Sequence, residues 1–353
     1  MPETPDQNKE DITASSAEFE FDAVPVQEPA VPNYTRRIQM LMAAIIVAIA
    51  GYTGAWFWFG QQLVKGTQIA ISQAALNGQT ITCDESTAKG YPFRMGLKCS
   101  KTGFADPAQN IKIEAGAFRS AAQVYQPRHI IGELDSPLTA NIGLLKPVTL
   151  NWALAHASFS ADGGLPKRVS LEIDQPVFAE TATPSIQAGQ ATLAGFYMRQ
   201  GENNQIDLAV KLEGAQIIDA PIFNFASDIA ISGATRFDAA LESKRPLIEV
   251  VRGNDGQLRN AALTFLTGGS VTVSGPFSIS QSGLLSATLK VKAEKADQLI
   301  DNLGKLSLAF GAAPINLTAL KAMAITDEIN LTVIIKDGNA SIGFIPLGSI
   351  PSL

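Results

Sequence analysis

Short runs of alternating apolar and polar residues recur along most of the chain beyond residue 100. The clearest runs cover residues 111–114, 169–174, 206–212, 271–280, 285–291 and 329–335. A period of two places every second side chain on the same face of a strand, so each run predicts a strand with one apolar face. In the fourth run, Val271, Val273, Phe277 and Ile279 are predicted to point inward. Turn sequences such as Ser282-Gly283 and 336–339 separate the runs, which favours an antiparallel sheet with one buried face.

A different pattern occupies the N-terminal part, where residues 38–59 contain no charged side chain. A helix of about 20 apolar residues spans the hydrocarbon core of a bilayer, so this run predicts a transmembrane helix. Arg36 and Arg37 precede the run directly, and the next basic residue is Lys65. The basic flank predicts a cytoplasmic N-terminus, with the main domain in the periplasm of a bacterial inner-membrane protein. The aromatic residues 56–59 fall at the far end of the run, where aromatic side chains prefer the headgroup boundary.

A cleaved signal peptide is the alternative explanation of this run, because Ala48-Ile49-Ala50 has the form of a cleavage site. The long acidic leader and the continuation of the run to residue 59 favour the uncleaved anchor. We therefore predict a tail over residues 1–35, a transmembrane helix over 36–60 and a juxtamembrane helix over 61–78 that ends at Gly78. A periplasmic β-rich domain is predicted over 79–353.

Two helices are predicted late in that domain. Apolar residues at 296, 299, 300 and 303 have helical spacing, with Gly304 as the predicted C-cap. A second helix is expected around 315–323. The predicted fold is thus mainly β with a few helices, an extended curved antiparallel sheet behind a single N-terminal transmembrane helix. Two sub-lobes meeting near residues 200–250 are the alternative.

Charge is concentrated at the N-terminus. Residues 1–35 contain eight acidic residues and one lysine, whereas the whole 353-residue chain has a formal net charge of −6. The tail also contains several prolines and few large apolar residues, so it is predicted to be disordered. The remainder is nearly neutral and lacks the basic surface that nucleic-acid binding requires. We therefore expect no nucleic-acid partner.

Only two cysteines occur, Cys83 and Cys99, and both follow the apolar run. An even number of cysteines on the oxidising side of a membrane predicts a disulfide. Their midpoint is Tyr91, within the turn sequence Gly90-Tyr91-Pro92-Phe93-Arg94. A hairpin folded at this turn would place Cys83 opposite Cys99. A redox or zinc site is disfavoured, because the chain has neither a Cys-x-x-Cys motif nor four clustered ligands.

Catalytic motifs are scarce. His129 and His156 are the only histidines, and neither lies near a nucleophile motif. The glycine-rich segment 267–270 lacks the lysine of a phosphate-binding loop. We predict no enzymatic activity, no cofactor and no metal site. A hydrolase built from distant residues would need one of the histidines beside a serine or aspartate.

Four features in order resemble the proteobacterial domain-of-unknown-function family 2125. They are the aromatic-ended anchor, the cysteines around Gly90–Arg94, the strand 271–275 followed by 299–303, and the C-terminal segment from Lys336-Asp337-Gly338 to Pro351. Tyr91 departs from the phenylalanine usual in this motif, and the acidic tail has no counterpart in it. The resemblance implies a membrane-anchored protein without an established activity. The plan also resembles that of AsmA-type envelope proteins, which handle lipid.

These observations favour a non-enzymatic envelope-maintenance module that holds a lipid or another apolar ligand along a concave sheet. Such a module needs an apolar groove, for which Val271, Phe277 and Ile279 are candidate lining residues. The alternative is a scaffold for a periplasmic protein partner. Within the turn motif, Arg94 is predicted to stabilise the turn, and gripping a lipid phosphate is its alternative role.

Overall fold

The computed structural model describes residues 34–143, 146–160, 164–181, 187–218, 220–243, 250–309 and 327–352. The predicted helix around 315–323 and nearly all of the acidic tail lie outside these ranges. The chain divides into two compact units, Met1–Gly51 and Tyr52–Leu353. No division falls near residues 200–250, so the alternative of two sub-lobes is not supported.

The apolar run belongs to one long helix, α1 (Tyr34–Leu76). This helix passes through residue 60 without interruption, so the juxtamembrane helix continues the apolar run. It ends where Gly78 adopts a positive φ of 77°. The Gly78 amide donates to the Ala75 carbonyl and the Gln79 amide to the Ala74 carbonyl, at 3.0 Å each. These bonds satisfy the last carbonyl groups of the helix in the manner typical of a glycine C-cap.

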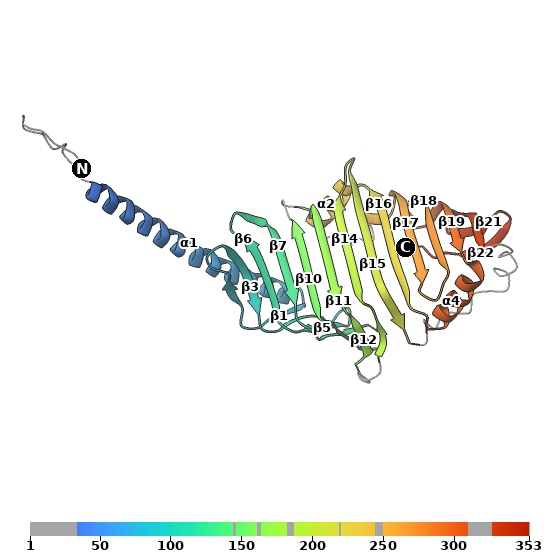
Figure 1. Cartoon of the computed structure of the whole chain (residues 1–353), viewed down its shortest axis with the longest axis horizontal. Coiled ribbons are helices and arrows are strands. Elements are labelled where there is room, and N and C mark those ends of the chain that lie inside the picture. Colours follow the sequence, from blue (N-terminus) through green and yellow to red (C-terminus); the bar gives the residue numbers. More distant parts are fainter. Residues whose placement is uncertain are drawn as a thin grey trace, which may run out of the picture. The chain divides into compact units, whose positions relative to one another are not determined.

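The rest of the described chain is mainly β, and neighbouring strands are antiparallel throughout. One series of paired strands forms what we call the long arm. In spatial order it comprises β2 (Thr87–Lys89), β3 (Arg94–Cys99), β6 (Phe118–Gln123), β7 (Gln126–Leu134), β10 (Leu154–Ser160), β11 (Arg168–Asp174), β14 (Leu193–Gln200), β15 (Gln205–Ile217), β16 (Phe223–Ser232), β17 (Asp255–Phe265), β18 (Ser270–Ile279), β19 (Leu285–Glu294), β20 (Glu328–Lys336), β21 (Asn339–Ile342) and β22 (Ile345–Ser349). These strands stand side by side across the molecule in Figure 1.

A second series of shorter strands forms the short arm, which runs along the lower margin of the long strands in Figure 1. In spatial order it comprises β1 (Thr80–Cys83), β4 (Thr102–Asp106), β5 (Ile111–Ala115), β8 (Leu138–Ile142), β9 (Val148–Asn151), β12 (Val177–Glu180) and β13 (Gln187–Gln190). Its last strand, β13, pairs with the C-terminal end of β15. The two arms therefore meet in one continuous strand.

The two arms are one sheet folded along a crease. Each strand of the short arm continues a strand of the long arm after a corner of two or three residues, as in β3–β4, β5–β6 and β7–β8. Hydrogen bonds continue through the corners: the Ser100 amide donates to the Asp84 carbonyl at 2.8 Å, and the Thr192 amide to the Glu213 carbonyl at 2.8 Å. Because the ladder is not interrupted, the fold needs no separate second sheet.

Residues of special backbone conformation make the corners possible. Gln175 has a φ of 51°, and Gly214, at the bend within β15, has a φ of 57°. A Cβ atom on Gly214 would lie 2.5 Å from the Thr192 hydroxyl oxygen, and one on Gly116 would lie 2.7 Å from the Asp135 carbonyl oxygen. Glycine is needed at both positions, as is common where strands bend or bulge.

Strand prediction from the alternating runs is confirmed. The six runs coincide with the strands β5, β11, β15, β18, β19 and β20, and only the fourth run extends one residue beyond its strand. The predicted turn at 336–339 is the connection between β20 and β21, where Asp337 and Gly338 have φ values of 47° and 82°. Two residues of positive φ are typical of the tight turn that joins a β-hairpin.

Two helices cover parts of the long arm: α2 (Ala234–Glu242) and α4 (Ala296–Ala309). Phe237 of α2 belongs to a cluster with Ile206, and Leu299 of α4 to a cluster with Phe265. The sequence pattern did not predict α2. The predicted end of α4 at Gly304 is wrong, because the helix continues to Ala309 with Gly304 buried inside it. Leu306, beyond that glycine, still packs on the cluster, and this packing outweighs a helix-propensity cost of about 1 kcal/mol for glycine.

Candidate functional site

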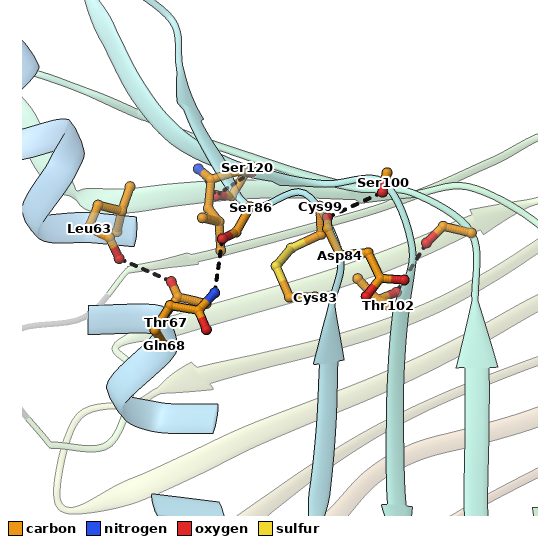
Figure 2. Close-up of a disulfide and its surroundings, with 12 residues drawn as sticks. Leu63, Thr67, Gln68, Cys83, Asp84, Ser86, Cys99, Ser100, Thr102 and Ser120 are labelled. Atoms are coloured by element: carbon orange, nitrogen blue, oxygen red, sulfur yellow. Dashed lines mark hydrogen bonds between the residues drawn. A yellow bond between two sulfur atoms is a disulfide. The ribbon is translucent and has the colours of Figure 1, made fainter. Parts of the chain in front are cut away.

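The two arms of the creased sheet face each other with their apolar sides, and the disulfide shows this most directly. Cys83 at the end of β1 is bonded to Cys99 at the end of β3, with 5.1 Å between their Cα atoms (Figure 2). One cysteine lies on the short arm and the other on the long arm, so the bond ties the arms together across the crease. In an antiparallel sheet, alternate side chains share a face. The bond therefore identifies the inner face of each arm.

The predicted pairing of the cysteines is present, but the predicted hairpin register is wrong. Across the turn, Thr87 pairs with Lys98, and β1 pairs with β4, so that Cys83 lies opposite Thr102. The register is shifted by three residues from a hairpin centred on Tyr91. The corner that separates β1 from β2 explains the shift, because it moves Cys83 out of the long arm and into the short one.

Two adjacent rows of the inner face cross the long arm without a charged side chain. The first row contains Cys99, Phe118, Leu134, Ala155, Ile173, Ala194, Leu212, Phe225, Leu263, Val271, Ala293 and Ile329. The second row contains Gly132, Ala157, Leu171, Phe196, Val210, Ser227, Ala261, Val273, Val291 and Leu331. The alternating pattern of the sequence thus becomes a continuous apolar surface.

This surface is open in its middle. Phe159, Leu171 and Phe196 of the long arm and Phe178 of the short arm all belong to the inner face, and their residues are between 36% and 40% exposed. We call this set of four exposed inner-face residues, three on the long arm and one on the short arm, the trough. A run of half-exposed large apolar side chains is unusual for a folded domain and is typical of a surface that binds an apolar partner.

The residues that were predicted from the sequence to line an apolar groove are mostly covered by other parts of the chain. Val271 points inward as predicted, but it packs on the cluster that contains Leu299 of α4. Ile279 is buried, and the ring of Phe277 lies over Gly256, where an added Cβ would be 2.2 Å from it. Val271 and Ile279 are therefore covered, whereas Phe277 is partly buried and lines a surface hollow with Pro276 and Ile335. The trough residues carry the same alternating pattern, so the pattern alone could not separate the two sets.

At the end of the short arm, the trough side continues into a hollow. Described residues, among them Phe178, Ile217 and Leu308, line a cavity of about 850 Å³ between the short arm and α4. Ligand pockets in proteins commonly measure about 300 to 1,000 Å³ and have mainly apolar linings. The size and lining of this hollow suit an apolar ligand.

The turn motif Gly90–Arg94 lies at the first edge of the sheet, against α1. The indole Nε1–H of Trp56 donates to the Arg94 carbonyl at 2.9 Å, and the Tyr91 hydroxyl lies 2.8 Å from the Thr53 hydroxyl. Further along, Gly60 packs on Ala88, with 3.0 Å between an added Cβ and the alanine Cβ. Gln68 of α1 donates to Ser86 at the corner (Figure 2). The helix therefore covers the first edge of the sheet and protects an otherwise unpaired strand edge.

The outer face of the long arm is polar and contains both histidines. His129 Nδ1 lies 3.1 Å from the Ser160 hydroxyl, and His156 Nε2 lies 3.3 Å from Glu172. Both pairs are direct cross-strand neighbours, and such neighbours interact in any sheet. The serine beside His129 meets one requirement of a hydrolase. A nucleophile also needs its base oriented by a third group, and no carboxylate contact to His129 is present within the described ranges.

Tyr197 and Asp207 extend this polar surface. Burial, together with the hydrogen bond that the Tyr197 hydroxyl donates to Glu172 at 2.8 Å, raises the pKa of Tyr197 to about 12. Burial alone would raise the pKa of Asp207, but hydrogen bonds from Arg199 at 2.7 Å and Arg259 at 2.6 Å outweigh it and hold that pKa below its ordinary value. The surface is an ion-pair network. In the described part of the chain, no three His, Cys, Asp or Glu side chains gather as a metal site.

A single antiparallel sheet, creased into an apolar trough and preceded by a helix long and apolar enough to cross a membrane, defines the class of this protein. By length and composition, this helix is a candidate membrane anchor or signal sequence. The model of an uncharacterised protein family conserved in bacteria, DUF2125, matches residues 56–351. The chain belongs to this family, as its motifs suggest. No curated protein and no solved structure matches the chain.

Proposed function

We propose that this protein is a non-enzymatic module of the bacterial envelope that holds an apolar ligand, of the lipid acyl-chain class, in the trough. The observation that carries the proposal is the set of four half-exposed apolar residues on the facing arms, Phe159, Leu171, Phe178 and Phe196. Burying such side chains against a ligand is favourable by about 25 cal/mol per Å² of apolar surface. The absence of charge in the two central rows favours a chain-like apolar ligand over a polar one.

The location that we propose is the inner membrane, with α1 as an uncleaved anchor and the sheet in the periplasm. Arg36 and Arg37 before the apolar run support this orientation. The disulfide supports an oxidising compartment for the sheet. Cleavage after Ala50 would leave Tyr52–Leu76 and its contacts intact. The fold is therefore compatible both with an uncleaved anchor and with a cleaved signal peptide. Intact mass of the mature chain distinguishes them: the anchor predicts residues 1–50 retained, and their loss would refute it.

The trough is tested by native mass spectrometry and lipid extraction of the full-length protein. Leu171→Gln with Phe196→Gln places two polar groups in the trough and is expected to lower ligand occupancy at least about tenfold, equivalent to about 1.4 kcal/mol. Ile131→Gln is the matched control, because Ile131 is similarly exposed but lies on the outer face, opposite Ser158. Equal occupancy in all three proteins, or no co-purified apolar molecule, would refute the trough as a binding site.

A protein scaffold is the second candidate, and the last hairpin of the long arm favours it. Phe344, Ile345 and Leu347 are exposed on or beside β22. An exposed edge strand can accept a strand from another protein. Crosslinking in cells would identify such a partner. If Phe344→Asp abolishes a specific crosslink and the trough variants have no effect on ligand, the scaffold function replaces the one proposed here.

We also propose that the Ser160–His129 pair is structural. The two residues are aligned because their strands pair, which requires no catalytic role. A fluorophosphonate probe labels activated serines. Labelling that disappears in Ser160→Ala would contradict this proposal.

A further inference from the structure

Two neighbouring turns at the first edge of the long arm carry exposed aromatic side chains. The β2–β3 turn presents Tyr91 and Phe93, and the β6–β7 turn presents Val124 and Tyr125. The Val124 amide donates to the Phe93 carbonyl at 3.1 Å, which holds the two turns together. Phe93 is 72% exposed and Tyr125 is 71% exposed. We call these four side chains, three aromatic and one valine, the aromatic tips.

The aromatic tips are fixed to the end of the apolar run of α1. Tyr52 donates a hydrogen bond to the Pro92 carbonyl, and Thr53 meets the Tyr91 hydroxyl at 2.8 Å. The rings of Phe57 and Tyr91 are stacked, with 6.0 Å between their centroids. The turns therefore lie at the level of the segment 52–57, which closes the uncharged run.

The chemistry of this surface matches a bilayer boundary. Tyrosine and tryptophan concentrate at the headgroup level, where one part of the side chain is apolar and the other is wet. Lys89 and Arg94, on the strands that flank the first turn, are exposed cations. Positive groups beside apolar ones favour a surface of anionic lipids. Single exposed apolar residues are ordinary, but these four lie on two turns joined by a hydrogen bond, and one of them, Tyr91, stacks on the exposed Phe57.

We infer that the aromatic tips insert into the headgroup region of the bilayer leaflet at which α1 emerges, and so dock the sheet on the membrane surface. This inference rests on the proposed function, because it requires α1 to be a membrane anchor. Docking would keep the first edge of the sheet next to the lipids.

Spin-label accessibility in the full-length protein tests the inference. The described residues contain no free cysteine, so one introduced cysteine can carry the nitroxide label while mass spectrometry verifies the native disulfide. Phe93→Cys and Tyr125→Cys report on the tips. Phe344→Cys, at an exposed aromatic position of the last hairpin, is the matched aqueous control, and Ile46→Cys reports on the apolar run. The proteins are reconstituted in vesicles of phosphatidylethanolamine and phosphatidylglycerol.

Docking predicts that collisions with oxygen exceed those with a water-soluble nickel complex at positions 46, 93 and 125, and that nickel exceeds oxygen at 344. If 93 and 125 are as aqueous as 344 while 46 is in the membrane, docking is wrong and the anchor stands. If 344 is also in the bilayer, the domain adsorbs without a specific surface, and the inference fails. If 46 is aqueous, the anchor itself is wrong, and docking falls with it.

Discussion

The apolar face of the sheet is covered in two different ways along its length. From β1 to β15 the chain folds the sheet back on itself, and the short arm faces the long arm across the crease. From β16 to β22 the described residues form no short-arm strand, and α4 packs on the same face. The other helix, α2, packs on β14 to β16, where the two parts meet. We call these parts the creased region and the helix-covered region.

The difference shows in how completely each region buries its apolar side chains. In the helix-covered region Phe265 is 2% exposed, because helix side chains interdigitate with those of the sheet. In the creased region Phe196 belongs to the inner face but is 37% exposed, and neither of the two buried clusters that contain helix residues includes it. Helices thus make a core, whereas a crease leaves a trough. The same alternation of apolar and polar residues occurs in both regions.

The sharpest test of this comparison truncates one phenylalanine in each region. Phe265→Ala removes a ring packed on Phe223, 6.1 Å away between centroids, and is expected to lower the free energy of unfolding by about 3–5 kcal/mol. Phe196→Ala removes a half-exposed ring and is expected to cost about 1 kcal/mol in the ligand-free protein. Urea denaturation of both variants measures the difference. Equal losses would mean that the trough is packed core.

The second test removes the covalent tie of the creased region. Cys83→Ala with Cys99→Ala opens a loop with a sequence separation of 16 residues and is expected to cost about 3 kcal/mol in the chain-entropy model. Adding reductant to the wild-type protein should lower its unfolding midpoint in the same way and leave the double variant unchanged. A reductant effect on the double variant would show that the loss has another cause.

A third test concerns the closed edge of the creased region. Trp56→Phe keeps the ring at a buried position but removes the hydrogen bond to the Arg94 carbonyl, which is expected to cost about 1–2 kcal/mol. Trp58→Phe is the control, because Trp58 is exposed. Thermal unfolding in detergent should separate the two. An equal shift in both variants would argue against a specific contact between α1 and the turn.

The smallest expected effect lies on the outer face, where β14 to β17 join the two regions through the Asp207 network. The folded-state pKa of Asp207 is lowered, so its stabilisation is present above the ordinary carboxyl pKa and is lost as the pH falls through the folded-state value. Asp207→Asn is expected to cost about 1 kcal/mol at neutral pH, and this difference from wild type should vanish in acid. Urea titrations at both pH values measure it, with the exposed Glu202→Gln as control. A difference that persists in acid would assign the loss to packing.

Much of the fold could be predicted from local patterns. Alternation found β5, β11, β15, β18, β19 and β20, since period two is a property of a strand by itself. The apolar run and Gly78 likewise marked α1 and its end. The sequence pattern did not reveal α2, whose apolar residues Ala234, Phe237 and Ala240 are few and mostly small. Such a helix is stabilised by what it packs against.

The site was less predictable. The cysteines predicted the disulfide, but their spacing suggested a hairpin register that the structure does not have, because a corner of three residues between β1 and β2 shifts the register. Val271 and Phe196 have the same sequence pattern, yet one packs on α4 and the other lines the trough. Whether an apolar position becomes core or groove depends on a segment far away in the chain.

The sequence by itself therefore determined which faces are apolar, where the strands run and that two cysteines pair, because these are properties of neighbouring residues. The tertiary structure alone decided that the sheet folds at a line of corners, that the disulfide joins two arms, and that the open apolar surface lies around Leu171 and Phe196. These outcomes depend on long-range pairing and on what covers each face, and no short pattern in the sequence encodes either.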